Sequence, residues 1–336
     1  MIQIENLSKK YGDREVVSNI TLHVKKGDVL GFIGPNGAGK STTIRMISGV
    51  LPVYTGKILI DGIDISLSPR KAKSRIGYLP ENAPLPPNMT VRAFLKYVAS
   101  MRGLSLLNRG KAIREAVRSC ALENVLDQEI DSLSKGYKRR VCFAQAIIHK
   151  PSVLLLDEPT DGLDPNQKRE MRNLIKTLSR ETAIIISTHI LEEVRSVCSE
   201  VLLLSEGKIV FRGTTEMLTG LEKELQCYAL TFPPEQLLAA SIFLTEKFPG
   251  SCRLSNDTLI VFEEIAKNPE LPTLLDQAGI SLLSSEKCPA TLDDVFANMT
   301  QKKQKQKTAP VPQPISPQET YTPAAIADKE DENDDN

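Results

Sequence analysis

The chain has 336 residues, and its 42 basic side chains balance 42 acidic ones, so the formal net charge is zero. This balance argues against a general nucleic-acid-binding protein, which usually carries a basic excess. The six cysteines include no C-x-x-C pair, and we expect no signal peptide, a combination typical of reduced cytosolic thiols. No apolar run approaches the length of a membrane span, so we expect no membrane domain in this chain.

Strand-like apolar runs predict a layered α/β core over residues 1–213. These runs lie at 20–24, 29–33, 153–157, 183–187 and 201–204, with a further strand-like segment between 54 and 61. Residues 90–150 read instead as helices, because apolar side chains recur there at helical spacing. We therefore predict one α/β domain with a helical insert.

A phosphate-binding loop follows the strand predicted at 29–33. Residues 34–42 read GPNGAGKST, match G-x-x-x-x-G-K-[ST] and lead into a helix-like run. Glycines let several backbone N–H groups face one phosphate, and the helix start adds its positive dipole end. We expect Lys40 to contact the β- and γ-phosphates and the Ser41 hydroxyl to coordinate Mg²⁺. The candidate nucleotide contacts in this loop are Gly34, Pro35, Asn36, Gly37, Ala38, Gly39, Lys40, Ser41 and Thr42.

Two adjacent acids stand at the C-terminal end of the strand predicted at 153–157, where open α/β sheets bind ligands. We expect Asp157 to hold Mg²⁺, directly or through water, and Glu158 to polarise an attacking water. Two surface acids on a loop are the alternative, but Pro159 and a turn follow at once. His189 closes another core strand. A lone histidine is usually structural, yet beside the acids it is a candidate sensor of the γ-phosphate.

These motifs, together with Leu-Ser-Lys-Gly-Tyr at 133–137, resemble the nucleotide-binding subunits of ABC transporters over residues 1–213. LSKGY resembles the family signature LSGGQ, which generic P-loop proteins lack, and the N-K-x-D motif of GTPases is absent. The resemblance implies an ABC ATPase domain of the P-loop NTPase class that binds ATP and Mg²⁺ and hydrolyses ATP. It also implies that the helical insert docks on a membrane partner.

Further site residues follow from the resemblance alone. Tyr11 takes the place of the aromatic ring that stacks on adenine, and Val17 extends that platform. Ser134 and Gly136 would contact the γ-phosphate bound by a second protomer, and Asp164 matches the acid of the loop that links the two sites. Two alternatives stay open: Tyr11 as a packing residue of a β-hairpin, and Ser134 as an ordinary helix N-cap.

The chain departs from the usual family pattern in places that are informative. Glu81 stands where the family carries a glutamine that senses Mg²⁺, so we include it as a candidate metal contact. Lys135 and Tyr137 replace Gly and Gln of the signature. These departures, and the ending at 292–296, resemble the branch that serves ABC-2 type exporters of drugs, polysaccharides and gliding motility.

The branch resemblance implies an exporter ATPase that works with separate integral membrane permease subunits. The chain would then lie at the inner face of the cell membrane, on the cytoplasmic side. A homodimer is favoured because both halves of the composite site occur in one chain. The alternative is a soluble ABC ATPase that acts as a switch in translation or DNA repair, although such proteins usually carry two ATPase units or long insertions. A degenerate, merely binding protein is disfavoured by the intact motif set.

A small α+β accessory domain is predicted at 220–300. The order is strand 226–232, helix 234–247, strands within 252–262 around a turn at 255–257, helix 271–278 and strand 280–283. This β-α-β-β-α-β order resembles a ferredoxin-like module; it carries no catalytic constellation and serves dimer support, regulation or packing. Residues 301–336 hold a cluster of four lysines at 302–307, a Pro, Gln and Thr mixture and a run of acids, which predicts a disordered tail. The lysines either touch anionic lipid or are simply solvated.

Overall fold

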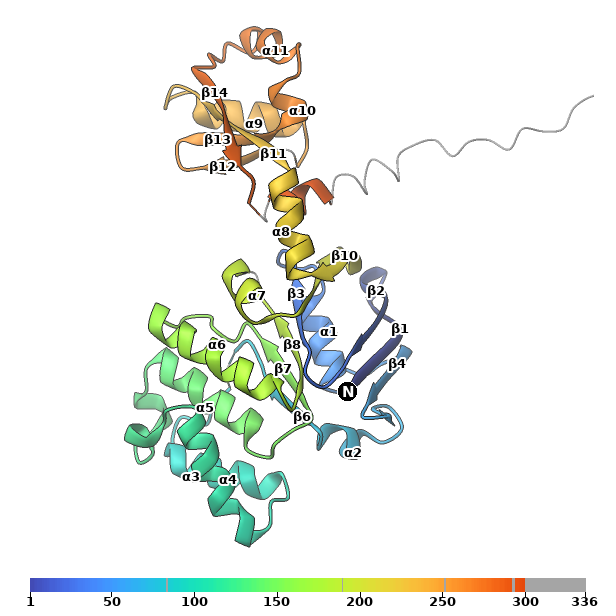
Figure 1. The fold of residues 1–336 in the computed structure, drawn as a ribbon, viewed down its shortest axis with the longest axis vertical. Helices are drawn as coiled ribbons and strands as arrows, with labels where there is room; N and C mark the ends of the chain where they lie inside the picture. Colours follow the sequence, from blue (N-terminus) through green and yellow to red (C-terminus); the bar gives the residue numbers. More distant parts are fainter. Residues whose placement is uncertain (83, 189, 251, 292–293, 300–336) are drawn as a thin grey trace, which may run out of the picture.

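The computed structural model describes residues 1–82, 84–188, 190–250, 252–291 and 294–299. Figure 1 shows a larger part, which carries the N-terminus, and a smaller part built from the C-terminal elements, with helix α8 between them. The two parts hold different sheets, and the larger one contains every predicted site residue that the structure describes.

A six-stranded sheet forms the centre of the larger part, in the order β10-β9-β3-β8-β7-β6. Its strands are parallel except for β10, which pairs antiparallel with β9. β7 and β8 are buried along their whole length, which explains why they read as continuous apolar runs. The bounds are β3 Val29–Ile33, β6 Ile76–Leu79, β7 Val153–Asp157, β8 Ala183–Ser187, β9 Glu200–Ser205 and β10 Lys208–Thr214. The predicted α/β fold is confirmed.

An antiparallel sheet of four strands, in the order β2-β1-β4-β5, accompanies the central sheet. Its strands are β1 Ile2–Tyr11, β2 Arg14–Val24, β4 Thr55–Ile60 and β5 Ile63–Asp64. One hydrophobic cluster joins this sheet to the central one, and helix α1 (Lys40–Ile47) contributes Ile44 and Ile47 to it. The loop before α1 is therefore held by the packing of both sheets.

The helices predicted between 90 and 150 are present and bury their apolar faces in a second large cluster. They are α3 Val91–Met101, α4 Leu106–Ser119 and α5 Lys135–Ile147; α2 Pro69–Lys73, α6 Pro165–Ser179 and α7 Leu191–Val197 complete the larger part. Thr90, Ser105, Ser134 and Asp164 are N-caps whose side chains accept a backbone N–H, so each of these helix starts is specified locally. Within the described ranges, no helix combines the length and apolarity needed to cross a membrane.

The C-terminal elements follow α8 (Thr215–Glu224) and form a third sheet in the antiparallel order β12-β13-β11-β14. They are β11 Gln226–Thr231, α9 Leu237–Lys247, β12 Cys252–Ser255, β13 Thr258–Phe262, α10 Glu263–Ala266, α11 Leu271–Gln277 and β14 Ser284–Pro289. The predicted element order is present with α10 added. The last strand was placed wrongly, because Ile280 packs in this module's core while Leu283 is 63% exposed, and β11 pairs with the polar residues that follow.

A short segment at 294–299 touches both parts of the molecule. Val295 is buried in the cluster that includes Leu218 of α8, and Met299 packs against the same cluster. Asp294 accepts Nε of Arg253 at 2.9 Å and its Nη2 at 3.1 Å, which ties the segment to β12. The division into domains at 213 and 220 stays a prediction, and the tail predicted at 301–336 lies outside the described residues.

Candidate active site

The predicted phosphate loop joins β3 to α1 at the C-terminal edge of the central sheet. Its backbone depends on glycine at two positions. Gly39 has φ +101°, and a Cβ there would lie 2.6 Å from the carbonyl oxygen of Val16. A Cβ on Gly34 would lie 2.3 Å from the carbonyl oxygen of Leu204. Side chains are excluded by both conformation and space, so the loop keeps the close backbone curl that an anion site needs.

Lys40 is the first residue of α1 and is only 6% exposed. Its Nζ donates to the carbonyl oxygens of Gly34, at 2.7 Å, and Pro35, at 3.1 Å. Burial lowers the pKa of Lys40, while the charges of Glu158, Asp157 and Glu81 raise it. The ammonium group therefore lies within the field of all three candidate acids, against the loop that would surround a phosphate.

The Asp157 carboxylate links the end of β7 to this loop. The Ser41 hydroxyl donates to Asp157 Oδ1 at 3.1 Å, and the Ser187 hydroxyl donates to the same oxygen. Asp157 Oδ2 is buried without a hydrogen-bond partner among the described residues. A hydroxyl beside a carboxylate that has a spare oxygen suits Mg²⁺, which usually completes its shell with phosphate oxygens and water. The described residues contain no cluster of three or more His, Cys, Asp or Glu side chains for an all-protein metal site.

Glu158 follows at the point where the chain leaves β7. Its φ is +50°, a left-handed conformation that costs a non-glycine residue about 1–2 kcal/mol. Its N–H donates to the backbone oxygen of Ser187 at 3.0 Å, so β8 helps to hold this turn. An unfavourable conformation that is held by its surroundings is common at functional sites.

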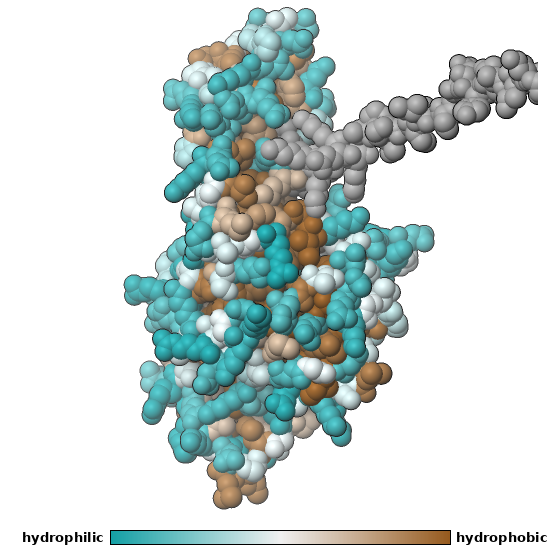
Figure 2. Space-filling view, turned by 45° about the vertical axis from the view of Figure 1, so that its right-hand side comes forward, coloured by the Kyte–Doolittle hydropathy of each residue, from teal (hydrophilic) through white to brown (hydrophobic). Residues whose placement is uncertain are grey.

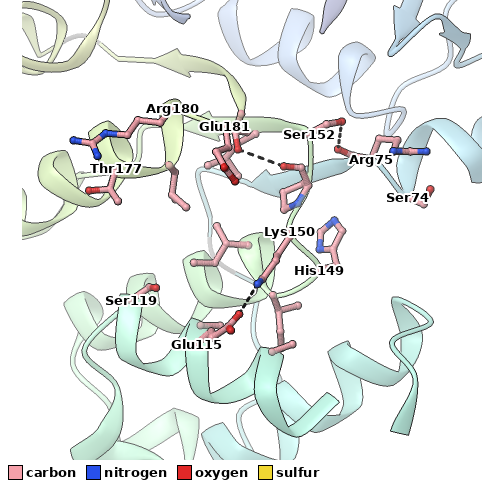
Figure 3. Close-up of a pocket in the computed structure, with 18 residues that line it drawn as sticks. Ser74, Arg75, Glu115, Ser119, His149, Lys150, Ser152, Thr177, Arg180 and Glu181 are labelled. Carbon is pink, nitrogen blue, oxygen red and sulfur yellow. Dashed lines mark hydrogen bonds and ion pairs between the residues drawn. The ribbon is translucent and has the colours of Figure 1, made fainter. Parts of the chain in front are cut away.

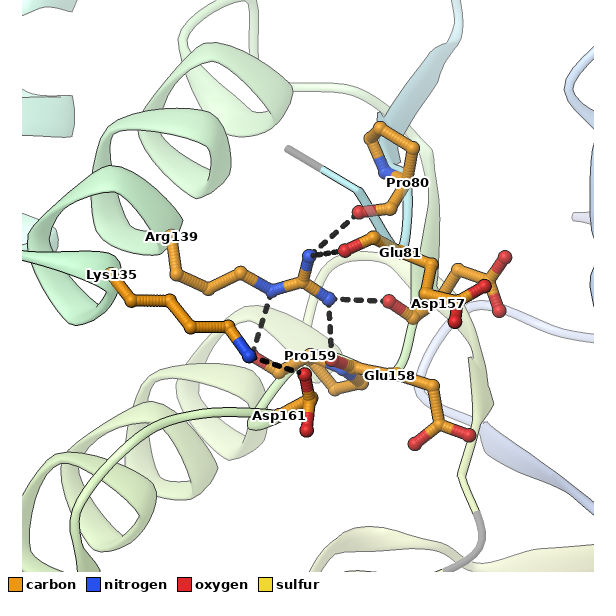
Figure 4. A network of polar contacts seen from close by, with 8 residues as sticks. All are labelled: Pro80, Glu81, Lys135, Arg139, Asp157, Glu158, Pro159 and Asp161. Atoms are coloured by element: carbon orange, nitrogen blue, oxygen red, sulfur yellow. Dashed lines mark hydrogen bonds and ion pairs between the residues drawn. The ribbon is translucent and has the colours of Figure 1, made fainter. Parts of the chain in front are cut away.

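The LSKGY motif begins α5. Ser134 caps that helix by accepting the Tyr137 N–H at 3.4 Å, so the N-cap alternative describes its state in one protomer. A Cβ on Gly136 would lie 2.4 Å from Oε1 of Gln167 on α6, so that flexible side chain would have to move to admit one. Lys135 pairs with Asp161 at 2.9 Å, as Figure 4 shows, and so points to the turn after Glu158.

The remaining predicted contacts differ in accessibility. Tyr11 ends β1 and is 50% exposed, with Lys9 Nζ 5.2 Å from its ring centre. Val17 is fully buried and lies against Gly39, so it supports the loop and offers no open surface. Glu81 is exposed just after β6. His189 lies outside the described residues, and its proposed contact with phosphate stays a prediction, as do the roles of the other site residues.

One buried acid near the site was not predicted. Glu193 of α7 is 2% exposed, and burial raises its pKa to about 7, with a further contribution from the charge of Glu158. The nearby Thr188 side chain opposes that shift, although neither Glu193 carboxylate oxygen has a hydrogen-bond partner among the described residues. Its neighbour Glu192 is exposed and pairs with Arg172 at 2.6 Å. Nothing in the sequence separates two adjacent glutamates, because only the packing of α7 decides which one is buried.

A cavity of about 860 Å³ lies at the other end of the central strands, where Arg75, Ser152 and Thr182 precede β6, β7 and β8 (Figure 3). Lys150 and Glu115 on its wall pair at 2.7 Å. Burial lowers the pKa of His149 there to about 4, so the imidazole is neutral near pH 7. No predicted site residue lines this cavity. The candidate active site is instead the cluster at the C-terminal strand ends.

Comparison with known proteins found several that are similar to this chain. A family model described as "ABC transporter" matches residues 17–161. The chain is 33% identical, over 301 residues, to the Nod factor export ATP-binding protein I of Burkholderia orbicola (strain AU 1054), covering 89% of this chain and 96% of the relative. It is 36% identical, over 215 residues, to the linearmycin resistance ATP-binding protein LnrL of Bacillus subtilis (strain 168), covering 64% of this chain and 69% of the relative.

A solved structure is also similar to this chain. The chain resembles the ATP binding subunit of an ABC transporter with a TM-score of 0.61 and 29% identity, over 66% of this chain and 92% of the other. The matched part has the length of the larger part described above, and the Nod factor relative extends the similarity over most of the chain.

Proposed function

Because the chain belongs to the family of ABC transporter ATP-binding proteins and is an ATPase of that class, we propose that it is the MgATP-driven subunit of an exporter. It would act as a homodimer on separate, ABC-2-like integral membrane permease subunits. The observation that carries the proposal is the meeting of Lys40, Ser41 and Asp157 at one point, where Asp157 Oδ2 is left without a partner among the described residues.

The phosphates of ATP would lie in the loop at 34–42, against its backbone N–H groups and the start of α1. Lys40 would leave the carbonyl oxygens that it now contacts and bind the β- and γ-phosphates. Ser41 and Asp157, with Glu81 nearby, would hold Mg²⁺, which neutralises charge that develops on the phosphate oxygens. Glu158 would orient and polarise the attacking water, with its backbone held by β8.

The other half of the site would come from a second copy. Ser134 and Gly136 lie at the start of α5, where a hydroxyl and free N–H groups can bind the γ-phosphate of the partner's ATP. The exposed ring of Tyr11 would stack on adenine, and Val17 would extend that platform. His189 would contact the γ-phosphate. ATP would thus close two copies face to face, and hydrolysis would release them.

Export and membrane attachment rest on the family relatives. One is named for Nod factor export and another for linearmycin resistance. We propose that this chain likewise energises export, from the cytoplasmic face of the membrane. Exposed apolar side chains on the helical part, including Tyr97, Met101, Leu106 and Leu107, support permease contact there.

The first experiment is the Glu158→Gln variant. We expect steady-state ATP hydrolysis to fall by about a hundredfold or more, because the water loses its polarising carboxylate, while MgATP binding persists and light scattering shows an ATP-dependent dimer. Glu181→Gln, an exposed residue before β8, is the matched control. Turnover near the wild-type rate in Glu158→Gln would refute the assigned roles.

The permease proposal needs a separate experiment. Tagged Glu158→Gln protein is purified with MgATP from detergent-solubilised cells, and its partners are identified by mass spectrometry. A polytopic membrane protein at stoichiometric yield is the expected result. Recovery of ribosomes or DNA-repair proteins, without a membrane partner, would contradict the transporter assignment and favour a soluble switch.

A further inference from the structure

Arg139 on α5 is a buried cation whose hydrogen bonds, within the described residues, all go to main-chain carbonyl oxygens. It is 4% exposed, and burial lowers its pKa, although the charges of Asp161, Asp157 and Glu158 favour the charged form. A buried guanidinium is costly unless its N–H groups are satisfied. Its carbonyl acceptors are those of Pro80, Glu81, Asp157, Glu158 and Pro159.

These acceptors belong to two different strand ends (Figure 4). Nη1 donates to Pro80 at 2.7 Å and to Glu81 at 2.6 Å, just beyond β6. Nη2 donates to Asp157 at 2.5 Å and also to Glu158, at the end of β7. One planar side chain therefore bridges the backbone of the candidate metal contact and the backbone of the candidate water-polarising acid.

The bridge also holds a residue whose conformation is unfavourable by itself. Glu158 has φ +50°, with its N–H bonded to β8 and its carbonyl bonded to Arg139. Each anchor holds one of the peptide groups that flank the Glu158 side chain. If the Arg139 anchor is lost, that backbone can relax, and the carboxylate moves away from the water that it must orient.

We propose that Arg139 is a positioning residue for ATP hydrolysis, which sets Glu81 and Glu158 relative to each other and links both to the helix that begins with LSKGY. This rests on the proposed roles of those two acids. In the described part of the chain no hydrogen bond joins Arg139 to the phosphate loop, so its removal should affect the chemical step far more than nucleotide binding.

The test compares Arg139→Gln and Arg139→Lys with wild type in steady-state ATPase assays and in MgATP binding by calorimetry. For Arg139→Gln we expect kcat to fall by about tenfold or more and the Kd for MgATP to change by less than about threefold. Arg139→Lys keeps the charge but lacks the planar fork that spans both strand ends, so it should recover only part of kcat.

Arg102→Gln is the matched control. Arg102 is a half-buried arginine that also donates to carbonyl oxygens near β6, but at its other end: those of Lys73, at 3.2 Å, and Ile76, at 3.3 Å. We expect its kcat to stay within about twofold of wild type, since a general loss of support for β6 is not enough to disturb the acids.

The outcomes separate this inference from the proposed function. If Glu158→Gln abolishes turnover while Arg139→Gln retains wild-type kcat, the positioning role is wrong and the assigned base stands. Equal losses of kcat and MgATP affinity in Arg139→Gln would show a merely structural role and also overturn the inference. If Arg139→Gln does not fold, Arg139→Lys decides: full kcat in that folded variant refutes the proposal.

Discussion

Replacing the buried Glu193 by glutamine should make the protein more stable at alkaline pH. Glu193 is 2% exposed, and burial raises its pKa from 4.5 to about 7. Between these two values the unfolded chain releases the proton while the folded chain keeps it. The contribution of Glu193 to the free energy of unfolding is therefore fully present below pH 4.5 and is lost as the pH rises through 7. A glutamine has no proton to lose, so the variant escapes this penalty.

The size of the effect follows from the shift. About 2.5 pKa units at 1.36 kcal/mol each correspond to about 3 kcal/mol, nearly all of it present by pH 8. The assay is urea unfolding of nucleotide-free protein at pH 5, 6, 7 and 8, with the free energy of unfolding taken at each pH. The advantage of Glu193→Gln over wild type should be below about 1 kcal/mol at pH 5 and grow steadily toward pH 8.

Glu192→Gln is the matched control on the same helix. Glu192 is exposed and paired with Arg172, which holds its pKa below the usual value, so its loss should bring no stabilisation that grows with pH. Parallel pH dependences for Glu193→Gln and wild type would refute the reasoning, since they would show that Glu193 is ionised and well solvated in the folded protein.

Two further predictions concern glycine and the C-terminal segment. Gly39→Ala should weaken MgATP binding by about tenfold or more in calorimetry, because φ +101° and a Cβ 2.6 Å from the Val16 carbonyl force the loop to move; Gly220→Ala on α8, where a Cβ meets open space and φ is not left-handed, should bind normally. Asp294→Ala should lower the free energy of unfolding in urea by about 2 kcal/mol, because Arg253 and the Thr291 N–H lose their shared acceptor; a change below about 0.5 kcal/mol would show that this network does not hold the segment.

Much of the central sheet can be predicted from sequence, for a physical reason. β3, β7 and β8 are buried on both faces, so each is a short apolar run bounded by glycine, proline or polar residues, and the predicted bounds match the observed ones. The last strand of the C-terminal module shows the limit of this pattern. β14 is an edge strand with mostly exposed side chains. The strand was predicted at 280–283 because that segment, just before β14, is apolar.

The residues of the candidate site also differ in whether the sequence predicts them. Lys40, Ser41 and Asp157 are predictable because their chemistry is tied to motifs, and the structure brings them together. Arg139 and Glu193 are not, because their importance depends on which carbonyl groups or acids lie opposite them in the folded chain. An arginine beside another arginine, or a glutamate beside another glutamate, carries no local signal of its burial.

The place of β3 in the middle of the central sheet has a consequence for biosynthesis. Its neighbours are β8 and β9, and the Val29 N–H reaches the hydroxyl of Ser199, 170 residues later. At ribosomal rates of about 5–20 residues per second, β3 waits roughly 10–30 s for these partners. During that time both edges of this apolar strand are unpaired, which makes the nascent chain prone to aggregation and a substrate for chaperones. ATP cannot stabilise the nascent chain at this stage, because the loop that would bind it is not yet held in place by β8 and β9.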